Sequence, residues 1–186
     1  MGRDRDPFER TLSGLRRHLV TSAPLQGAPL SVKAFAGELQ VSPTPVREAL
    51  ARLSGEGLVA RTQAGYAGVV HDRESLTGLY DLASVLAQAV LANMAPAQPI
   101  NAPAAGFIER LAARAKSRAL MVALLNVAAQ LAPFRTAESE ILQDDQDELA
   151  VGAAGEPTAP SVAKVRRYFR RRSRHAGEIL ARSLGL

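Results

Sequence analysis

The sequence predicts a mainly α-helical protein, in which three helices and a β-hairpin precede an all-helical second part. Composition is the first reason: only 4% of the 186 residues are aromatic and none is Trp, while Ala and Leu dominate. Sheets draw on β-branched and aromatic side chains, so this composition favours helices packed on helices. The balance of 47% hydrophobic and 22% charged residues is typical of a folded, globular chain.

The first predicted helix runs from about residue 6 to residue 21. Apolar side chains recur there at steps of four, three and four, as in the stripe of an amphipathic helix: Phe8, Leu12, Leu15 and Leu19. The segment 22–29 contains two prolines and a glycine and is predicted as a loop. Ser31 then stands where a side-chain oxygen N-caps a helix, so a short second helix is expected to begin there.

The third predicted helix opens at Ser42-Pro43-Thr44-Pro45, since proline is tolerated in a first helical turn. Its expected buried face consists of Val46, Ala49, Leu50 and Leu53. Two short strands are predicted over 58–62 and 66–70, and Gly65 can adopt the positive φ that the turn between them needs. This order is the layout of a winged helix-turn-helix, whose third helix enters the DNA major groove.

A continuous stretch from Val41 to Val59, VSPTPVREALARLSGEGLV, is similar to the signature of the GntR family of bacterial transcription regulators. The family pattern is close to V-S-R-T-P-V-R-E-A-L-x-x-L-x-x-E-G-L-V, and residues 30–39 resemble the family's second helix. The resemblance implies a winged helix-turn-helix DNA-binding domain over residues 7–71 of a cytoplasmic transcription regulator.

By the same resemblance, the DNA contacts fall on Lys33, Ser42, Thr44, Arg47 and the wing near Gly65. An Arg can pair bidentately with guanine, and Ser or Thr can reach a phosphate or a thymine methyl group. The alternatives are an ion pair from Arg47 to a neighbouring acid, an N-cap role for Ser42 and an ordinary surface position for Lys33.

Two residues depart from the family pattern. Pro43 stands where the family usually has a base-reading Arg, and the wing has Gln63-Ala64 where the family often has Asn-Arg before the glycine. We therefore expect an operator that differs from the common family sites and an affinity that depends more on dimerisation.

From residue 73 onward, apolar residues recur at helical spacing. We expect five helices: one of about five turns from residue 73, one at Phe107–Leu111, one reaching residue 131, one over 136–153 and one over 161–184. The segment Phe107-Ile108-Glu109-Arg110-Leu111 with Leu120 resembles the FCD-type effector-binding domain of the FadR-like GntR branch. The resemblance implies that residues 72–186 form a shortened domain of this type, which dimerises and binds a small-molecule effector.

The family domain often binds a divalent metal through one Asp and three His. The corresponding positions here hold Ala104, Ile108, Asp145 and Tyr168, of which only Asp145 is a plausible ligand. An open metal site needs about three protein ligands, so we predict no metal and no cofactor. His175 is predicted to be a surface residue.

Arg172 is unusual because it lies within the apolar stripe of the last predicted helix. Its stem can pack on the core while its head reaches solvent, or it can join Tyr168 to bind a small carboxylate effector. It can also neutralise the acidic helix that carries Asp144, Asp145, Asp147 and Glu148. Residues 136–160 hold seven acidic and no basic side chains, and residues 161–186 hold eight basic and one acidic. These blocks suggest two helices that pair with each other.

Enzymatic function is not expected. The chain has no Cys, its three histidines are far apart, and it shows no nucleophile–base pair or phosphate-binding loop. The N-terminus lacks the apolar core of a signal peptide, and the longest apolar stretch, 119–134, is shorter than the ~20 residues of a membrane span. We therefore expect no membrane association and a cytoplasmic location.

The sequence predicts a homodimeric repressor that binds a pseudo-palindromic operator in double-stranded DNA and responds to a small-molecule effector. One alternative is a DNA-binding regulator whose C-terminal domain only dimerises and senses no ligand. A second alternative is a winged helix that binds proteins, which would show no salt-dependent DNA binding.

Overall fold

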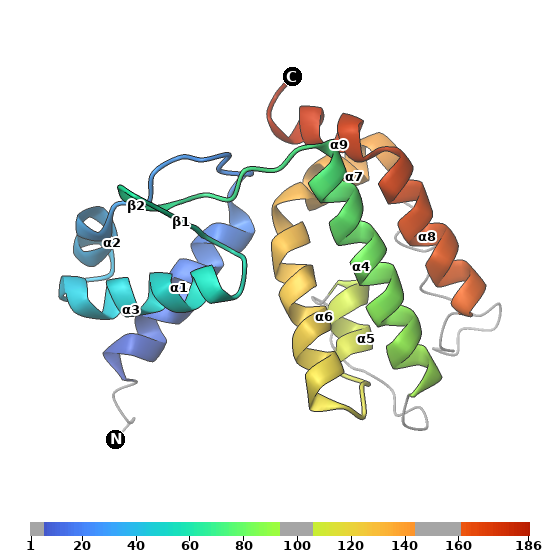
Figure 1. The fold of residues 1–186 in the computed structure, drawn as a ribbon, viewed down its shortest axis with the longest axis horizontal. Helices are drawn as coiled ribbons and strands as arrows, with labels where there is room; N and C mark the ends of the chain where they lie inside the picture. The colour runs from blue at the N-terminus through green and yellow to red at the C-terminus, as the bar shows by residue number, and fades with distance from the viewer. Residues whose placement is uncertain (1–5, 94–105, 144–160) are drawn as a thin grey trace. The chain divides into compact units, whose positions relative to one another are not determined.

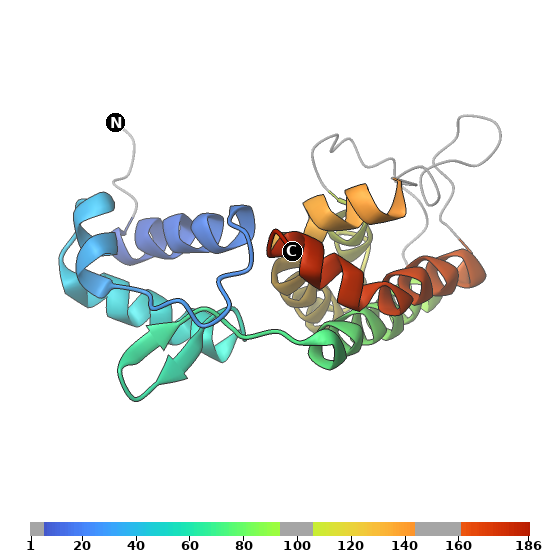
Figure 2. The ribbon, with the colours of Figure 1, turned by 90° about the horizontal axis from the view of Figure 1, so that it is seen from above.

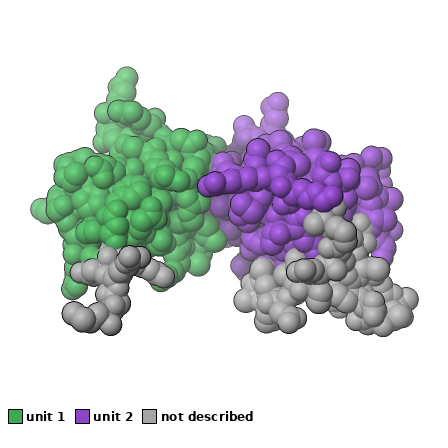
Figure 3. Space-filling model, turned by 90° about the horizontal axis from the view of Figure 1, so that it is seen from below, with its two compact units in different colours: residues 1–70 green, residues 71–186 purple. Residues whose placement is uncertain are grey.

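The computed structural model describes residues 6–93, 106–143 and 161–186, and the chain divides into two compact units, residues 1–70 and 71–186 (Figures 1 and 3). The first unit contains three helices followed by a hairpin, and the described part of the second is built from helices. The predicted fold class is confirmed: a winged helix-turn-helix precedes a helical domain.

The first unit is built on three helices: α1 (Pro7–Thr21), α2 (Val32–Glu38) and α3 (Pro43–Gly55). The Asp6 side chain starts α1 by accepting a hydrogen bond from the Phe8 N–H at 3.1 Å. Ser31 caps α2 as predicted, accepting from the Ala34 N–H at 3.2 Å. The predicted stripe of α1 packs against α3, and its buried members are Leu12, Leu15 and Leu19.

The hairpin is shorter than predicted and has a partner that the sequence did not reveal. Strand β1 (Ala60–Thr62) pairs antiparallel with β2 (Gly65–Ala67), and the segment predicted as a loop pairs with β2 through a bridge between Pro29 and Ala67. The Gly68 N–H donates to the Ala28 carbonyl at 2.9 Å on one side of this bridge. A Cβ on Gly68 would lie 2.3 Å from the Leu25 Cβ, so this close approach needs glycine.

The second unit surrounds the long helix α4 (Arg73–Ala92), against which α5 (Phe107–Ala112), α6 (Arg118–Leu131), α8 (Val162–Arg174) and α9 (Ala176–Ser183) pack. A 3-10 turn at Ala132–Phe134 joins α6 to α7 (Arg135–Leu142), which packs on α9. The largest side chains buried in this core are Tyr80, Phe134, Phe169, Leu76, Leu124 and Ile179.

Two of the predicted helices have different bounds. The single helix predicted over 161–184 is two helices, because the chain turns at His175 and this turn brings α9 onto α7 and α4, where Ile179 is buried. The helix predicted over 136–153 begins one residue earlier and ends at Leu142, since Gln143 adopts a left-handed conformation with φ of 50°. The rest of that prediction, and the acidic residues 144–148, lie outside the described residues.

By length and composition alone, two stretches of helix could cross a membrane, Arg73–Ala92 and Arg118–Leu142. The sequence predicted no such stretch. Both contribute to one packed core, which includes Tyr80 from the first and Leu124 from the second. Buried helices of a globular bundle meet the same criteria, so the stretches are weak evidence for membrane insertion.

His71, the first residue of the helical unit, gives the fold a pH dependence. Its ring packs edge-on against Phe134 with 5.2 Å between centroids, and burial lowers the pKa of the imidazole below 6.5, although Asp72 acts in the opposite direction. The folded protein therefore binds this proton more weakly than the unfolded chain does. The resulting stability is fully present above the unfolded pKa and is lost as the pH falls from there through the lower pKa of the folded state.

We expect the thermal unfolding midpoint of the helical unit to decrease as the pH is lowered from about 7.5 to about 5.5. In a His71→Gln variant, the midpoint should depend less steeply on pH. Circular dichroism melts across this range measure the effect. The control is His175→Gln, which removes another histidine of the helical unit. His175 lies at the surface, with 3.1 Å between its Nδ1 and the Glu178 Oε2, and not against the core. An unchanged slope in His71→Gln would contradict the assignment.

Candidate nucleic-acid interface

The helix α3 has one buried face and one exposed face. Its buried residues are 0% exposed, and they are the four predicted ones: Val46, Ala49, Leu50 and Leu53. The same helical spacing places Ser42, Thr44 and Arg47 among the exposed residues of the first two turns. The structure therefore brings together three of the five residues predicted to contact DNA.

The turn between α2 and α3 has a specific geometry. Gln40 adopts a positive φ of 53°, and the Val41 N–H donates to the Ala36 carbonyl at 3.0 Å. Leu39 packs against Gly14 of α1 so closely that a Cβ on Gly14 would lie 2.9 Å from the Leu39 Cδ2. These contacts fix the start of α3 relative to both preceding helices.

The Arg47 side chain makes no hydrogen bond or ion pair with any described residue. The alternative of an ion pair with Glu48 is therefore not seen in the described part of the chain. Arg52, on the same helix, has its Nε 3.4 Å from a Glu56 oxygen, and Arg16 of α1 bonds that carboxylate at 2.6 Å. The Arg47 guanidinium keeps all its donors for an external acceptor, whereas Arg52 is engaged.

Side chains provide most of the donors at the start of α3. Ser42 occupies the N-cap position, but its hydroxyl makes no capping hydrogen bond, so its side chain is available. Pro43 and Pro45 have no N–H, which leaves Thr44 as the only backbone donor among the first three residues of this helix. Phosphate contacts here therefore depend on the hydroxyls and on neighbouring cations more than on the helix backbone.

Lys33 and Gly65 lie on the elements next to α3. Lys33 is an exposed residue in the first turn of α2, and it has no polar partner among the described residues. Gly65 opens β2 with a φ of 125°, and the turn residues Gln63 and Ala64 are exposed. Figures 1 and 2 show the tip of the hairpin on the side of the unit where α3 begins.

The structure places the predicted effector residues, Tyr168 and Arg172, in contact with each other but inside the core. Arg172 is 7% exposed, its Nε donates to the Glu138 Oε2 at 2.9 Å, and its guanidinium carbon lies 3.4 Å from the centroid of the Tyr168 ring. The head therefore does not reach solvent as the snorkelling alternative required. The head pairs with Glu138 of α7. The third alternative also gave Arg172 an acidic partner, but it named the residues at 144–148.

Sequence reasoning missed two members of this buried network, Tyr80 and Glu138. The Tyr80 hydroxyl donates to the Glu138 Oε1 at 2.7 Å, so each carboxylate oxygen has a partner. Burial raises the pKa of Tyr80, as does the Glu138 charge, and burial raises the pKa of Tyr168 to about 12 against the opposing Arg172 charge. One sequence signal could have indicated this pair: Glu138 is a single acidic residue in the apolar stripe of α7, as Arg172 is a single basic residue in that of α8.

Two of the four positions compared with the family's metal ligands are described. Ile108 is buried in the helical core, and the Tyr168 ring contacts both the Phe107 ring and the Arg172 guanidinium. The other two, Ala104 and Asp145, lie outside the described residues. Over residues 6–93, 106–143 and 161–186, no three His, Asp or Glu side chains gather in a way that could hold a metal ion.

Comparisons with known proteins find a family match within the first unit. Residues 9–68 match the family model described as "Bacterial regulatory proteins, gntR family", and no curated protein matches the sequence. Among solved structures, E. coli McbR/YncC is similar, with a TM-score of 0.54 and 16% identity over 97% of this chain and 96% of that one. A structure titled "Lar controls the expression of the Listeria monocytogenes agr system and mediates virulence" has a TM-score of 0.38 and 13% identity, covering 97% and 99%. The likeness to McbR/YncC shows a shared fold.

Proposed function

We propose that this chain, whose residues 9–68 match the gntR family model, is a sequence-specific DNA-binding transcription regulator that acts in the cytoplasm and catalyses no reaction. One observation carries the proposal. Within the matched domain, the exposed face of the third helix presents Arg47 without a polar partner among the described residues.

In this proposal, α3 enters the major groove and Arg47 pairs bidentately with a guanine, a contact worth about 1–3 kcal/mol against a wrong base. Ser42 and Thr44 contact phosphate or a thymine methyl group, and Lys33 holds a neighbouring phosphate. The wing at Gly65 reaches the flanking backbone. Pro43 supplies no base contact, so the operator differs from sites read by an Arg at that position.

We infer that the protein acts as a homodimer assembled through its helical unit. The face of α4 opposite its core residues exposes Leu82 at 47% and Val85 at 63%, and on α6 Val122 is 53% exposed. Apolar side chains exposed together on one helix face favour association with a partner surface. Two-fold symmetry would place one α3 in each half of a pseudo-palindromic operator, and occupancy of a promoter would repress transcription.

The proposal includes a response to a small-molecule effector through the helical unit. A carboxylate effector bound at Tyr168 and Arg172 would have to replace Glu138, since that side chain already occupies the Arg172 fork. The alternative is a helical unit that only dimerises. A thermal shift with added metabolites separates the two, because a ligand that binds the folded state raises the unfolding midpoint.

The test is a fluorescence-anisotropy titration of the full chain against DNA from upstream of its own gene, beside a scrambled duplex, at several salt concentrations. We expect a preference of ~10³ or more for the native fragment, with log K falling steeply against log salt. Equal binding to both duplexes calls for selection from a random DNA library, and failure to enrich a motif there counts against sequence-specific regulation. Absence of binding even at low salt would overturn the proposal.

A further inference from the structure

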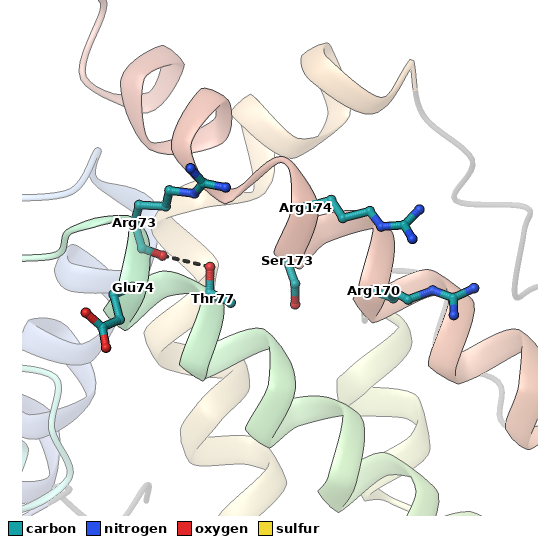
Figure 4. A pocket seen from close by; sticks show the side chains of 6 residues that line it. All are labelled: Arg73, Glu74, Thr77, Arg170, Ser173 and Arg174. Carbon is teal, nitrogen blue, oxygen red and sulfur yellow. Dashed lines mark hydrogen bonds between the residues drawn. The ribbon is translucent and has the colours of Figure 1, made fainter.

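A hollow lies on the outside of the helical unit, between the first turns of α4 and the last turns of α8 (Figure 4). It is a shallow hollow, open to solvent, with a volume of about 520 Å³. Six residues line it: Arg73, Glu74, Thr77, Arg170, Ser173 and Arg174. None of them belongs to the buried Arg172 network, so this is a separate feature of the unit.

The guanidinium groups of three arginines of the hollow have no polar partner among the described residues: those of Arg73, Arg170 and Arg174. Other arginines of α8 are engaged, since Arg171 donates to the Leu142 carbonyl at 2.8 Å and Arg166 donates to Gln88 at 3.1 Å. One carboxylate, that of Glu74, lines the hollow, and Figure 4 shows it turned away from Thr77 and Ser173. The lining therefore carries three positive charges and one negative charge.

The hydroxyls of the hollow have already donated their protons. Thr77 donates to the Arg73 carbonyl at 2.8 Å, and Ser173 donates to the Asp81 carboxylate at 2.8 Å. The donors that remain for a ligand are the guanidinium N–H groups, which come from two helices. Such a set suits a ligand that only accepts hydrogen bonds and carries more than one negative charge.

We propose that this hollow binds the phosphate group of a small phosphorylated molecule. Figure 4 shows Arg170 and Arg174 extending to one side of the hollow and Arg73 to the other. All three side chains are exposed, so they can turn toward a tetrahedral phosphate, whose oxygens point in several directions, whereas a planar carboxylate matches one arginine fork. The hollow is larger than a phosphate ion alone, which leaves room for an organic part.

The site gives the proposed effector response a location and a ligand class, and in that sense it rests on the proposed function. Arg73 is the first residue of α4, and only His71 and Asp72 separate it from the end of the DNA-binding unit at Val70. An anion shared by Arg73 and α8 stabilises the start of α4, where the chain leaves that unit. Anion binding that favours one conformation of this connection would also change the affinity of the protein for DNA.

The test is isothermal titration of the full chain with pyrophosphate at constant ionic strength, without DNA, with citrate as a matched carboxylate polyanion. We expect saturable binding of pyrophosphate and weaker binding of citrate. Arg170→Gln/Arg174→Gln should weaken pyrophosphate binding by at least about tenfold, and Arg73→Gln should weaken it as well. Arg170→Lys/Arg174→Lys, which keeps the charge but removes the forks, should give an intermediate loss.

The control is Lys116→Gln/Arg118→Gln, which removes two other exposed charges of the helical unit and should leave the binding unchanged. Circular dichroism melts confirm that each variant is folded. Absence of saturable binding, equal affinity for citrate, or equal losses in the control and the hollow variants would overturn the proposal. Because no DNA is present, these outcomes are independent of whether the protein discriminates operator from scrambled DNA.

Discussion

Replacing Glu138 with alanine should lower the free energy of unfolding of the helical unit by about 3–5 kcal/mol, because the change leaves the buried Arg172 charge without its partner. The carboxylate is 8% exposed and accepts hydrogen bonds from both Tyr80 and Arg172. Its removal therefore strands a cation and a hydroxyl at once. Urea denaturation followed by circular dichroism measures the loss.

The matched control is Glu140→Ala on the same helix, since Glu140 pairs with Arg182 at the surface. An exposed pair contributes about 0–1 kcal/mol, so the control should change stability little. Replacing both buried partners together, as in Glu138→Leu/Arg172→Met, should recover much of the loss. Equal losses in Glu138→Ala and Glu140→Ala would contradict the buried network.

Replacing Arg47 with alanine should abolish discrimination between operator and scrambled DNA while leaving weak, salt-sensitive binding. The lost contact is worth about 1–3 kcal/mol in each half-site, and a dimer would lose it twice. The phosphate contacts of Lys33 and the hydroxyls remain, so the residual binding should still weaken steeply with salt. Anisotropy titrations of both duplexes measure both effects.

The control for this variant is Arg52→Ala, another exposed arginine of α3, which is engaged by Glu56 instead of being free for DNA. We expect it to keep the preference for the operator. If Arg47→Ala discriminated between operator and scrambled DNA as well as the unchanged protein does, base recognition through Arg47 would be contradicted. If Arg52→Ala lost discrimination to the same degree, the loss would reflect the removal of a positive charge and not of a specific contact.

The DNA-binding unit was predictable because its signals are local. Ser31 precedes a helix that its side chain caps, and the four apolar residues of α3 repeat at helical spacing. The bridge between Pro29 and Ala67 was not predictable, because it joins residues distant in the sequence and two prolines indicated a loop.

The features of the helical unit that sequence reasoning missed depend on packing between distant segments. Glu138 and Arg172 each interrupt an apolar stripe, yet nothing local says that the two residues meet. The apolar pattern continues through His175, so it predicts one helix over 161–184. The turn there depends on the packing of α9 against α7 and α4, which the local pattern does not contain. The hollow combines Arg73 with Arg174, which only the packing of α4 on α8 brings together.

The prolines at the start of α3 have a consequence for the kinetics of DNA recognition. A pyrrolidine ring holds φ near −65°, so the φ angles of Pro43 and Pro45 already have their helical values in the free protein. Less backbone entropy then remains to be lost when the helix docks. We therefore expect the association rate to be set by diffusion and by attraction between the basic side chains and DNA, so that it falls with added salt.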